Sequence, residues 1–117
     1  MTSADTAQVE NLDLERSAIL SAVASIVKSE DPQAKVYLFG SRARMDHHNE
    51  SDWDFFIATS KPDHRKFEDV ILDAVYDVML EYDELIQILA YPKASWEKGL
   101  SPSPIYDNIR KEGLELC

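Results

Sequence analysis

The sequence predicts an α/β (α+β) fold: one domain in which a small mixed sheet is covered by helices. Three short apolar runs have the length and the aromatic or β-branched content of buried strands. These runs are residues 36–39, 52–59 and 85–91. Segments with helical spacing of apolar residues precede, separate and follow the runs, and a chain of 117 residues suits one layered domain.

The N-terminal part of the chain divides into an arm and a helix. Residues 1–11 are polar and show no periodicity, so we expect a flexible arm. Residues 12–117 form the predicted domain. Its first element is a helix at residues 12–29, where apolar residues recur at intervals of three and four. Asp31 precedes Pro32 and therefore avoids the helical conformation, which ends this helix.

Two strands come next, joined by a polar loop. The apolar run 36–39 ends at Gly40, and the residues that follow are rich in turn formers. The strand 52–59 begins with charged residues before it becomes apolar. Period-two alternation places Asp52 and Asp54 on one face of this strand and the odd-numbered apolar residues on the other.

The C-terminal half alternates between helix and strand in the same way. Apolar residues in the range 67–82 match helical spacing at every step, and Asp63 is placed to cap this helix. The strand 85–91 stops at a proline, and a short helical turn follows. A last helix at 105–111 ends at Gly113, a residue typical of helix C-termini.

The composition excludes several classes of function. The chain has 12 basic and 22 acidic residues and a formal net charge of −10, which repels a phosphate backbone over a wide surface. We therefore expect no extended nucleic-acid binding. No apolar run reaches the ~18–20 residues of a membrane span, and the single cysteine, Cys117, cannot form an internal disulfide. These features predict a cytoplasmic protein with no membrane association.

The excess of negative charge has two interpretations. It keeps the protein soluble, or it attracts a basic protein partner through charge complementarity. Composition alone does not separate the two.

Residues 39–57, FGSRARMDHHNESDWDFFI, carry the candidate chemistry. Gly40 and Ser41 follow a strand at a sharp turn, where backbone N–H groups and a hydroxyl suit phosphate oxygens; the simpler interpretation is a structural turn. Asp52 and Asp54 lie on one strand face, so their charges repel unless a cation lies between them. Mg²⁺ is the natural cation for carboxylate and phosphate oxygens. The alternative is a pair of surface aspartates at the start of a strand.

Together the two features resemble the nucleotidyltransferase superfamily of the polymerase-beta type. A Gly-Ser turn follows an apolar strand, ten residues intervene, and Asp-x-Asp opens the next apolar strand. The segments GSRAR and SDWDFFI are similar to those of the minimal nucleotidyltransferases, small domains that often serve as antitoxins paired with HEPN-type toxins. The resemblance extends over residues 12–116 and implies a nucleotidyltransferase fold.

The resemblance also implies a nucleotide site and a reaction. Gly40, Ser41, Arg42 and Arg44 would bind the triphosphate of ATP or another NTP, with the arginines neutralising phosphate charge. The implied reaction is the Mg²⁺-dependent transfer of AMP from ATP to a hydroxyl group of a partner protein. That partner would be a basic, HEPN-type toxin, which the chain would modify as its antitoxin.

By the same resemblance, Asp52 and Asp54 would be the catalytic carboxylates and would bind the Mg²⁺. The family usually has a third carboxylate on a neighbouring strand, and the third strand here has Gln87 at that position. Asp83 and Glu84 precede this strand and are expected in a helix end and turn. Because glutamine cannot accept a proton as a base, a second hypothesis is a binding module with little or no activity that neutralises a partner by direct contact.

Overall fold

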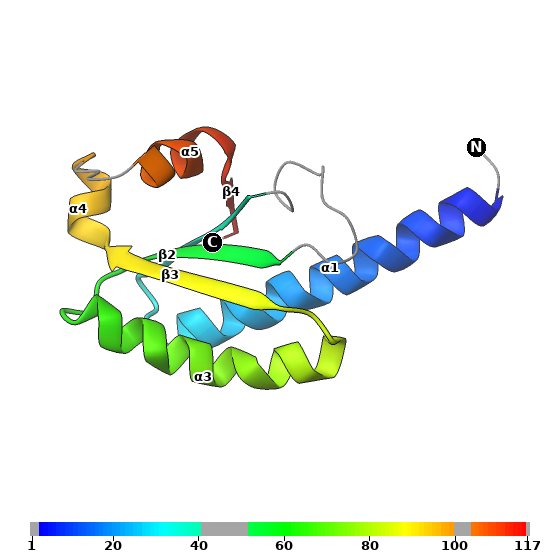
Figure 1. Ribbon diagram of the computed structural model, residues 1–117, viewed down its shortest axis with the longest axis horizontal. Coiled ribbons are helices and arrows are strands. Elements are labelled where there is room, and N and C mark those ends of the chain that lie inside the picture. The colour runs from blue at the N-terminus through cyan, green and yellow to red at the C-terminus, as the bar shows by residue number, and fades with distance from the viewer. Residues whose placement is uncertain (1–2, 41–51, 100–103, 117) are drawn as a thin grey trace.

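The computed structural model describes residues 3–40, 52–99 and 104–116, with side chains from Arg16 onward except at residue 105. Within these residues the elements surround one four-stranded sheet (Figure 1). The strands are β1 (Lys35–Phe39), β2 (Trp53–Thr59), β3 (Ile86–Pro92) and β4 (Leu114–Glu115). The helices are α1 (Ser3–Glu30), α3 (His64–Tyr82), α4 (Lys93–Glu97) and α5 (Pro104–Glu112).

The sheet is mixed, which confirms the predicted fold class. Its strand order is β3-β2-β1-β4, with β1 antiparallel to both β2 and β4 and with β2 parallel to β3. A parallel pair needs a crossover connection, which α3 supplies. The register places Asp54 of β2 between Phe39 of β1 and Gln87 of β3. The start of β2 therefore lies between the end of β1 and the start of β3.

Helices cover both faces of the sheet (Figure 1). α1 and α3 lie on one face, whereas α4 and α5 lie on the other. Trp53, Phe55 and Ile57 of β2 pack into the core beneath α1 and α3, and Phe56 and Ala58 pack against α4 and α5. This division confirms the alternation that the sequence predicts for β2. A strand covered on both faces must be apolar along most of its length, and within β2 only Asp54 and the last residue, Thr59, are polar.

Two aspartates, Asp63 and Asp83, define the ends of α3. The Asp63 side chain accepts a hydrogen bond from the backbone N–H of Lys66 at 3.1 Å and so caps the helix, as predicted. Asp83 ends the helix in the left-handed conformation, with φ of 53°. The buried residues are Phe67, Ile71, Val75 and Val78. Val70 is one of the apolar residues whose helical spacing predicts α3, but it is exposed. Each helical residue turns by about 100°, which places Val70 outside the face centred on Ile71.

Aromatic packing fixes the layer of α4 and α5. The Trp96 ring lies 4.5 Å from that of Phe56, centroid to centroid. The guanidinium carbon of Arg110 lies 3.8 Å from the centroid of the Trp96 ring, and Arg110 also donates a hydrogen bond to the Trp96 carbonyl oxygen. Ile109 is buried beside these residues. The cation–π contact and the apolar burial together hold α5 against α4.

A buried carboxylate connects the end of α1 to the end of β2. Asp31 is only 1% exposed. It accepts hydrogen bonds from the Thr59 hydroxyl at 2.8 Å, from the amide and hydroxyl of Ser60 at 2.7 Å each, and from the Gln33 amide at 3.1 Å. Burial raises the pKa of Asp31, but these hydrogen bonds outweigh it and hold the pKa below its ordinary value of 3.8. The fold itself compensates this charge.

The first helix is longer than the sequence analysis expected. α1 begins at Ser3, so residues 3–11, which were expected to form an arm, are helical. Residues 3–30 contain no glycine or proline. Because these two residues are the ones that interrupt helices, the predicted helix continues without a break through residues 3–11. None of the helices in the described segments combines the length and the apolarity that crossing a bilayer requires.

The last strand was not predicted. β4 has only two residues, which pair with Tyr37 and Leu38 of β1. Gly113 separates β4 from α5, and its N–H donates to the Ile109 carbonyl oxygen at 2.8 Å. A Cβ at Gly113 would lie 2.5 Å from that oxygen, so the helix end depends on a residue without a side chain.

Candidate functional site

The N-terminal end of β2 brings three polar side chains together. Asp52 directly precedes the strand and Asp54 is its second residue. The parallel register sets Asp54 opposite Gln87 of β3, and Nε2 of Gln87 donates a hydrogen bond to Oδ2 of Asp52 at 2.5 Å. The side chain at the position predicted for a third carboxylate therefore contacts the predicted metal-binding pair.

Asp54 carries a charge that its surroundings disfavour. The residue is partly buried. Burial, and then the negative charge of Asp52, raise the pKa of Asp54 above its ordinary value of 3.8. Both causes oppose the ionised form. In the described segments no basic side chain is paired with either carboxylate, so the repulsion between the two is not offset there.

Gly40 lies against this pair of carboxylates. It follows β1 with a positive φ of 76°, which favours glycine. A Cβ at this position would lie 2.6 Å from Oδ2 of Asp54, so any other residue would force that carboxylate to move. The pairing of Phe39 with Asp54 explains this closeness, because Gly40 is the next residue along the chain. The start of the Gly-Ser turn and the Asp-x-Asp motif are therefore neighbours in space.

The donor set at this end of β2 fits a hard divalent cation. Mg²⁺ is commonly bound by one or two carboxylates together with phosphate oxygens and water, and Asp52 and Asp54 supply the two carboxylates. Burial and the charge of Asp52 raise the pKa of Asp54, and a bound cation would favour its ionised form. Among the described residues no group of three or more His, Cys, Asp or Glu side chains is placed to hold a metal.

Several residues of the predicted site are not placed by the structure. Ser41, Arg42 and Arg44 lie outside the described residues, and their contacts with phosphate stay predictions. Asp83 caps the end of α3 in the left-handed conformation, and Glu84 follows it before β3 begins. These two residues lie in the helix end and turn that the sequence predicts.

The hydrogen bond between Gln87 and Asp52 is the feature of the site that sequence reasoning did not supply. The sequence places Gln87 as the polar residue in the middle of an apolar strand, which is the only local signal. Its partner depends on the parallel register of β2 and β3, which pairs residues more than thirty positions apart.

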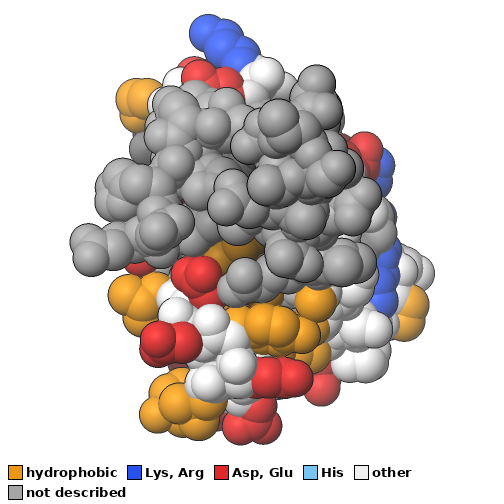
Figure 2. Space-filling model, turned by 90° about the vertical axis from the view of Figure 1, so that its right-hand side faces the viewer, with side chains coloured by type: hydrophobic (Ala, Val, Ile, Leu, Met, Phe, Trp, Pro, Cys, Tyr) orange, Lys and Arg blue, Asp and Glu red, His pale blue; other side chains and the backbone are white. Residues whose placement is uncertain are grey.

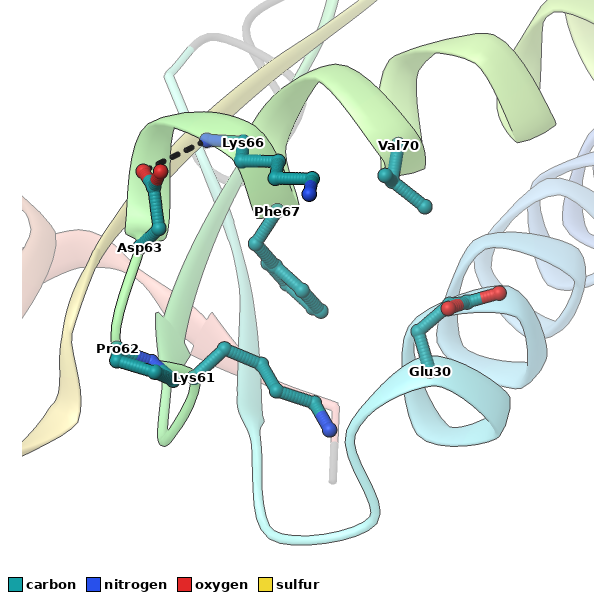
Figure 3. A pocket seen from close by; sticks show the side chains of 7 residues that line it. All are labelled: Glu30, Lys61, Pro62, Asp63, Lys66, Phe67 and Val70. Atoms are coloured by element: carbon teal, nitrogen blue, oxygen red, sulfur yellow. Dashed lines mark hydrogen bonds between the residues drawn. The ribbon is translucent and has the colours of Figure 1, made fainter.

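A surface hollow lies at the other end of β2, beyond Thr59 (Figure 3). It is lined by Glu30, Lys61, Pro62, Asp63, Lys66, Phe67 and Val70. Lys61 and Lys66 extend into this hollow, Asp63 lies next to Lys66 at the start of α3, and Glu30 lies across the hollow on α1. The charges of the lining residues balance, and the hollow is remote from Asp52 and Asp54. It is therefore separate from the candidate site.

Comparisons with known proteins identify the family and the fold of the chain. Residues 21–98 match the family described as "Polymerase beta, Nucleotidyltransferase". A chain of a solved structure described as "Crystal structure of the toxin-antitoxin with AMP-PNP" has a similar fold, with a TM-score of 0.61 and 15% sequence identity. The similarity covers 84% of this chain and 72% of that chain. No curated protein sequence matches this chain.

Proposed function

Because the chain belongs to the polymerase beta nucleotidyltransferase family, we propose that it is a Mg²⁺-dependent nucleotidyltransferase. The nucleotide donor is ATP, the transferred group is AMP, and the acceptor is a hydroxyl group of a partner protein. The proposed partner is a basic, HEPN-type toxin, so the chain acts as an antitoxin by modifying it. The proposed compartment is the cytoplasm, in agreement with the single cysteine.

The observation that carries the proposal is the pair of carboxylates at the start of β2, for which the described residues supply no basic partner. Asp52 and Asp54 lie side by side, and their proximity together with burial raises the pKa of Asp54. A carboxylate in that state gains most from a bound cation. Elsewhere in the fold, at Asp31, a buried carboxylate is supplied with hydrogen-bond donors. The contrast supports binding, not stability, as the role of the pair.

The proposed reaction forms one ester bond and breaks one anhydride bond. The acceptor oxygen attacks the α-phosphorus of ATP, a new P–O bond forms, and pyrophosphate leaves with the electron pair of the broken bond. Asp52 and Asp54 would hold a divalent cation, whose positive charge would neutralise the phosphate oxygens. Gln87 holds Asp52 in place through its amide hydrogen bond.

Gln87 cannot act as the base that takes the proton of the acceptor hydroxyl. An amide cannot accept a proton, so the proton would leave to solvent water. Loss of a general base lowers rates by about 10²- to 10⁴-fold. We therefore expect AMP transfer to be slow. A slow reaction still suffices to modify a partner that stays bound.

Gly40 would bring the backbone close to the nucleotide. Without a side chain it leaves room beside Asp54, and the backbone of such a turn can approach phosphate oxygens closely. Ser41, Arg42 and Arg44 follow it in the sequence. In the proposal the Ser41 hydroxyl donates to phosphate and the arginines neutralise its charge.

The solved structure with the similar fold supports the proposal that this chain binds a nucleotide and a partner protein. It is described as a toxin-antitoxin with AMP-PNP. By analogy, this chain would bind ATP and a toxin. The excess of acidic residues supports a basic partner.

A second candidate function is favoured by Gln87. A carboxylate at its position would add negative charge for a second metal ion or serve as a base, and the amide does neither. The hydrogen bond from Gln87 instead partly satisfies Asp52. In this alternative the chain keeps the fold and neutralises its partner by direct contact, with little or no transfer.

Label transfer separates the two functions. The chain is incubated with ATP labelled at the α-phosphate, with Mg²⁺ and with the protein encoded beside it. We expect label on that protein, and we expect the Asp52→Asn, Asp54→Asn double variant to lose the label. Asp107→Asn is the matched control, because Asp107 is an exposed carboxylate on α5.

The result that would refute the transferase is also clear. It is the absence of labelled partner while a stable complex forms equally well with the wild type and with the double variant. That outcome would support the binding module.

A further inference from the structure

The outer face of α3 carries a row of large apolar side chains that the fold leaves uncovered. Leu72, Tyr76 and Leu80 are spaced four residues apart, so they lie along one face of the helix. They are 41%, 57% and 65% exposed. The row spans about 12 Å, at 1.5 Å per helical residue. We name these three residues the α3 ridge.

An acidic row runs beside the α3 ridge. Its members are exposed and are again spaced four residues apart: Asp69, Asp73, Asp77 and Glu81. Like charges at this spacing destabilise a helix. Residues 67–92 contain no Lys, Arg or His, and none of the acidic row is in an ion pair within the described part of the chain. The chain itself therefore leaves both the apolar row and the acidic row without a counterpart there.

The C-terminal end of α3 lies at the candidate active site. α3 ends at Tyr82, and β3 begins at Ile86, directly beside Trp53 of β2. Leu85, in the turn between them, is 65% exposed, and its carbonyl oxygen accepts a hydrogen bond from the Trp53 backbone N–H at 2.9 Å. Figure 2 shows acidic and hydrophobic side chains side by side at this end of the molecule. A protein bound along α3 would thus lie near the start of β2, on the face of the sheet opposite to the one from which Asp52 and Asp54 extend.

We propose that the α3 ridge and the acidic row form the docking surface for a basic amphipathic helix of a partner protein. Apolar side chains of that helix cover the ridge, and its Lys and Arg side chains pair with the acidic row. Charge disfavours the other occupants. A second copy of this chain brings the same acidic row, and nucleic acids and anionic membranes are also negative. The proposal rests on the proposed function only for the existence of a protein partner.

Synthetic peptides test the chemistry of this surface. The first is a helix of Leu and Lys with its leucines on one face. The second has the same composition in scrambled order, and the third replaces every Lys of the first by Glu. Binding to the full chain is measured by fluorescence anisotropy without Mg²⁺ or nucleotide. We expect the Leu/Lys helix to bind at least about tenfold more tightly than the scrambled peptide, and the Glu peptide not to bind.

Variants locate the binding on the surface. Tyr76→Ser with Leu80→Ser removes most of the ridge and should weaken binding by at least about tenfold. Leu114→Ser is the matched control, since Leu114 is 41% exposed but lies on β4 at the opposite edge of the sheet. Asp73→Lys with Asp77→Lys keeps the ridge and should abolish the preference for Lys over Glu. This variant also serves if the serine variant fails to fold.

Three results would overturn the docking surface. The first is equal binding of the helical and the scrambled peptide, and the second is an equal loss of binding in Leu114→Ser. The third is a dimer of the unliganded chain in sedimentation that the Tyr76→Ser, Leu80→Ser variant dissociates, because a second copy would then occupy the ridge.

The proposed docking surface and the proposed function can be refuted independently of each other. The Asp52→Asn, Asp54→Asn variant should bind the Leu/Lys helix as the wild type does, because docking needs no catalysis. Absence of label transfer with peptide binding intact refutes the transferase alone. Label transfer that the ridge variant leaves unchanged refutes the docking surface alone.

Discussion

The two ends of β2 hold carboxylates in opposite electrostatic states. At the C-terminal end, Asp31 is almost fully buried, yet hydrogen bonds from Thr59, Ser60 and Gln33 hold its pKa below the ordinary value. At the N-terminal end, Asp54 is less buried, yet burial and the charge of Asp52 raise its pKa. Burial alone does not decide the outcome. What decides it is whether the fold supplies donors.

This difference between the two ends of β2 suggests a different role for each carboxylate site. A buried charge with its donors in place stabilises the fold and needs nothing from outside. A pair of like charges without a counter-charge lowers stability until a cation binds, which is the usual balance at functional sites. The same strand therefore has a structural end and an end that we propose binds a cation, and substitutions at the two ends should have opposite effects on stability. We call the second the binding end.

The largest expected effect separates activity from stability at the binding end. Asp54→Asn removes a proposed cation ligand, and we expect label transfer to fall by about 100-fold or more. The same change removes the repulsion from Asp52, so the free energy of unfolding without metal should stay the same or rise by up to about 1 kcal/mol. Label transfer and urea unfolding measure the two. A loss of stability would mean that the carboxylate supports the fold.

The structural end should respond in the opposite way. Asp31→Ala leaves the donors of Thr59, Ser60 and Gln33 without an acceptor, and we expect the free energy of unfolding to fall by about 3 kcal/mol. Asp31→Asn keeps one acceptor oxygen and should lose less. Urea unfolding measures both variants. A loss below about 1 kcal/mol in the alanine variant would show that the hydrogen bonds contribute little.

Gln87→Glu sharpens the comparison by adding charge at the binding end. A third carboxylate beside Asp52 should tighten Mg²⁺ binding by about tenfold, because affinity rises with the number of charged ligands. Without metal the same variant should be less stable than the wild type. Gln87→Met is the control, since it has similar length and no charge. Calorimetric titration with Mg²⁺ checks the affinity, and an unchanged affinity would place residue 87 away from the cation.

The smallest expected effect is in the pH dependence of stability. The folded pKa of Asp31 lies below 3.8, so its contribution is present above pH 3.8 and is lost as the pH falls below that value. The folded pKa of Asp54 lies above 3.8, so its ionised form lowers stability as the pH rises through that pKa. The difference in unfolding free energy between the wild type and Asp31→Asn should therefore shrink in acid. The difference for Asp54→Asn should also vanish in acid but have the opposite sign at neutral pH.

Much of the fold follows from local patterns in the sequence. The alternation of β2 predicts which side chains face each helical layer, because a residue on a strand has only two faces to choose from. Asp63 caps α3 as predicted, since capping involves residues only three apart. β4 was missed because two residues show no periodicity, and only pairing with β1 defines the strand.

The sequence predicts which residues form the candidate site, but it does not predict how they are arranged in space. Asp52 and Asp54 follow from their spacing on one strand. Their relation to Gly40 and Gln87 depends on strand pairing between distant parts of the chain, which no local pattern gives. The α3 ridge had a visible signal, because Leu72, Tyr76 and Leu80 are apolar residues outside the predicted core face of α3. An amphipathic pattern identifies one face of a helix and leaves the other unexplained.

The central claim is that Asp52 and Asp54 form a cation-dependent nucleotide site. The most direct test is the free energy of unfolding with and without Mg²⁺ and a non-hydrolysable ATP analogue, for the wild type and for the Asp52→Asn, Asp54→Asn variant. At 100 times the dissociation constant, ligand should add about 2.7 kcal/mol to the wild type, only when Mg²⁺ is present, and nothing to the variant. No gain in the wild type, or an equal gain in the variant, would contradict the claim.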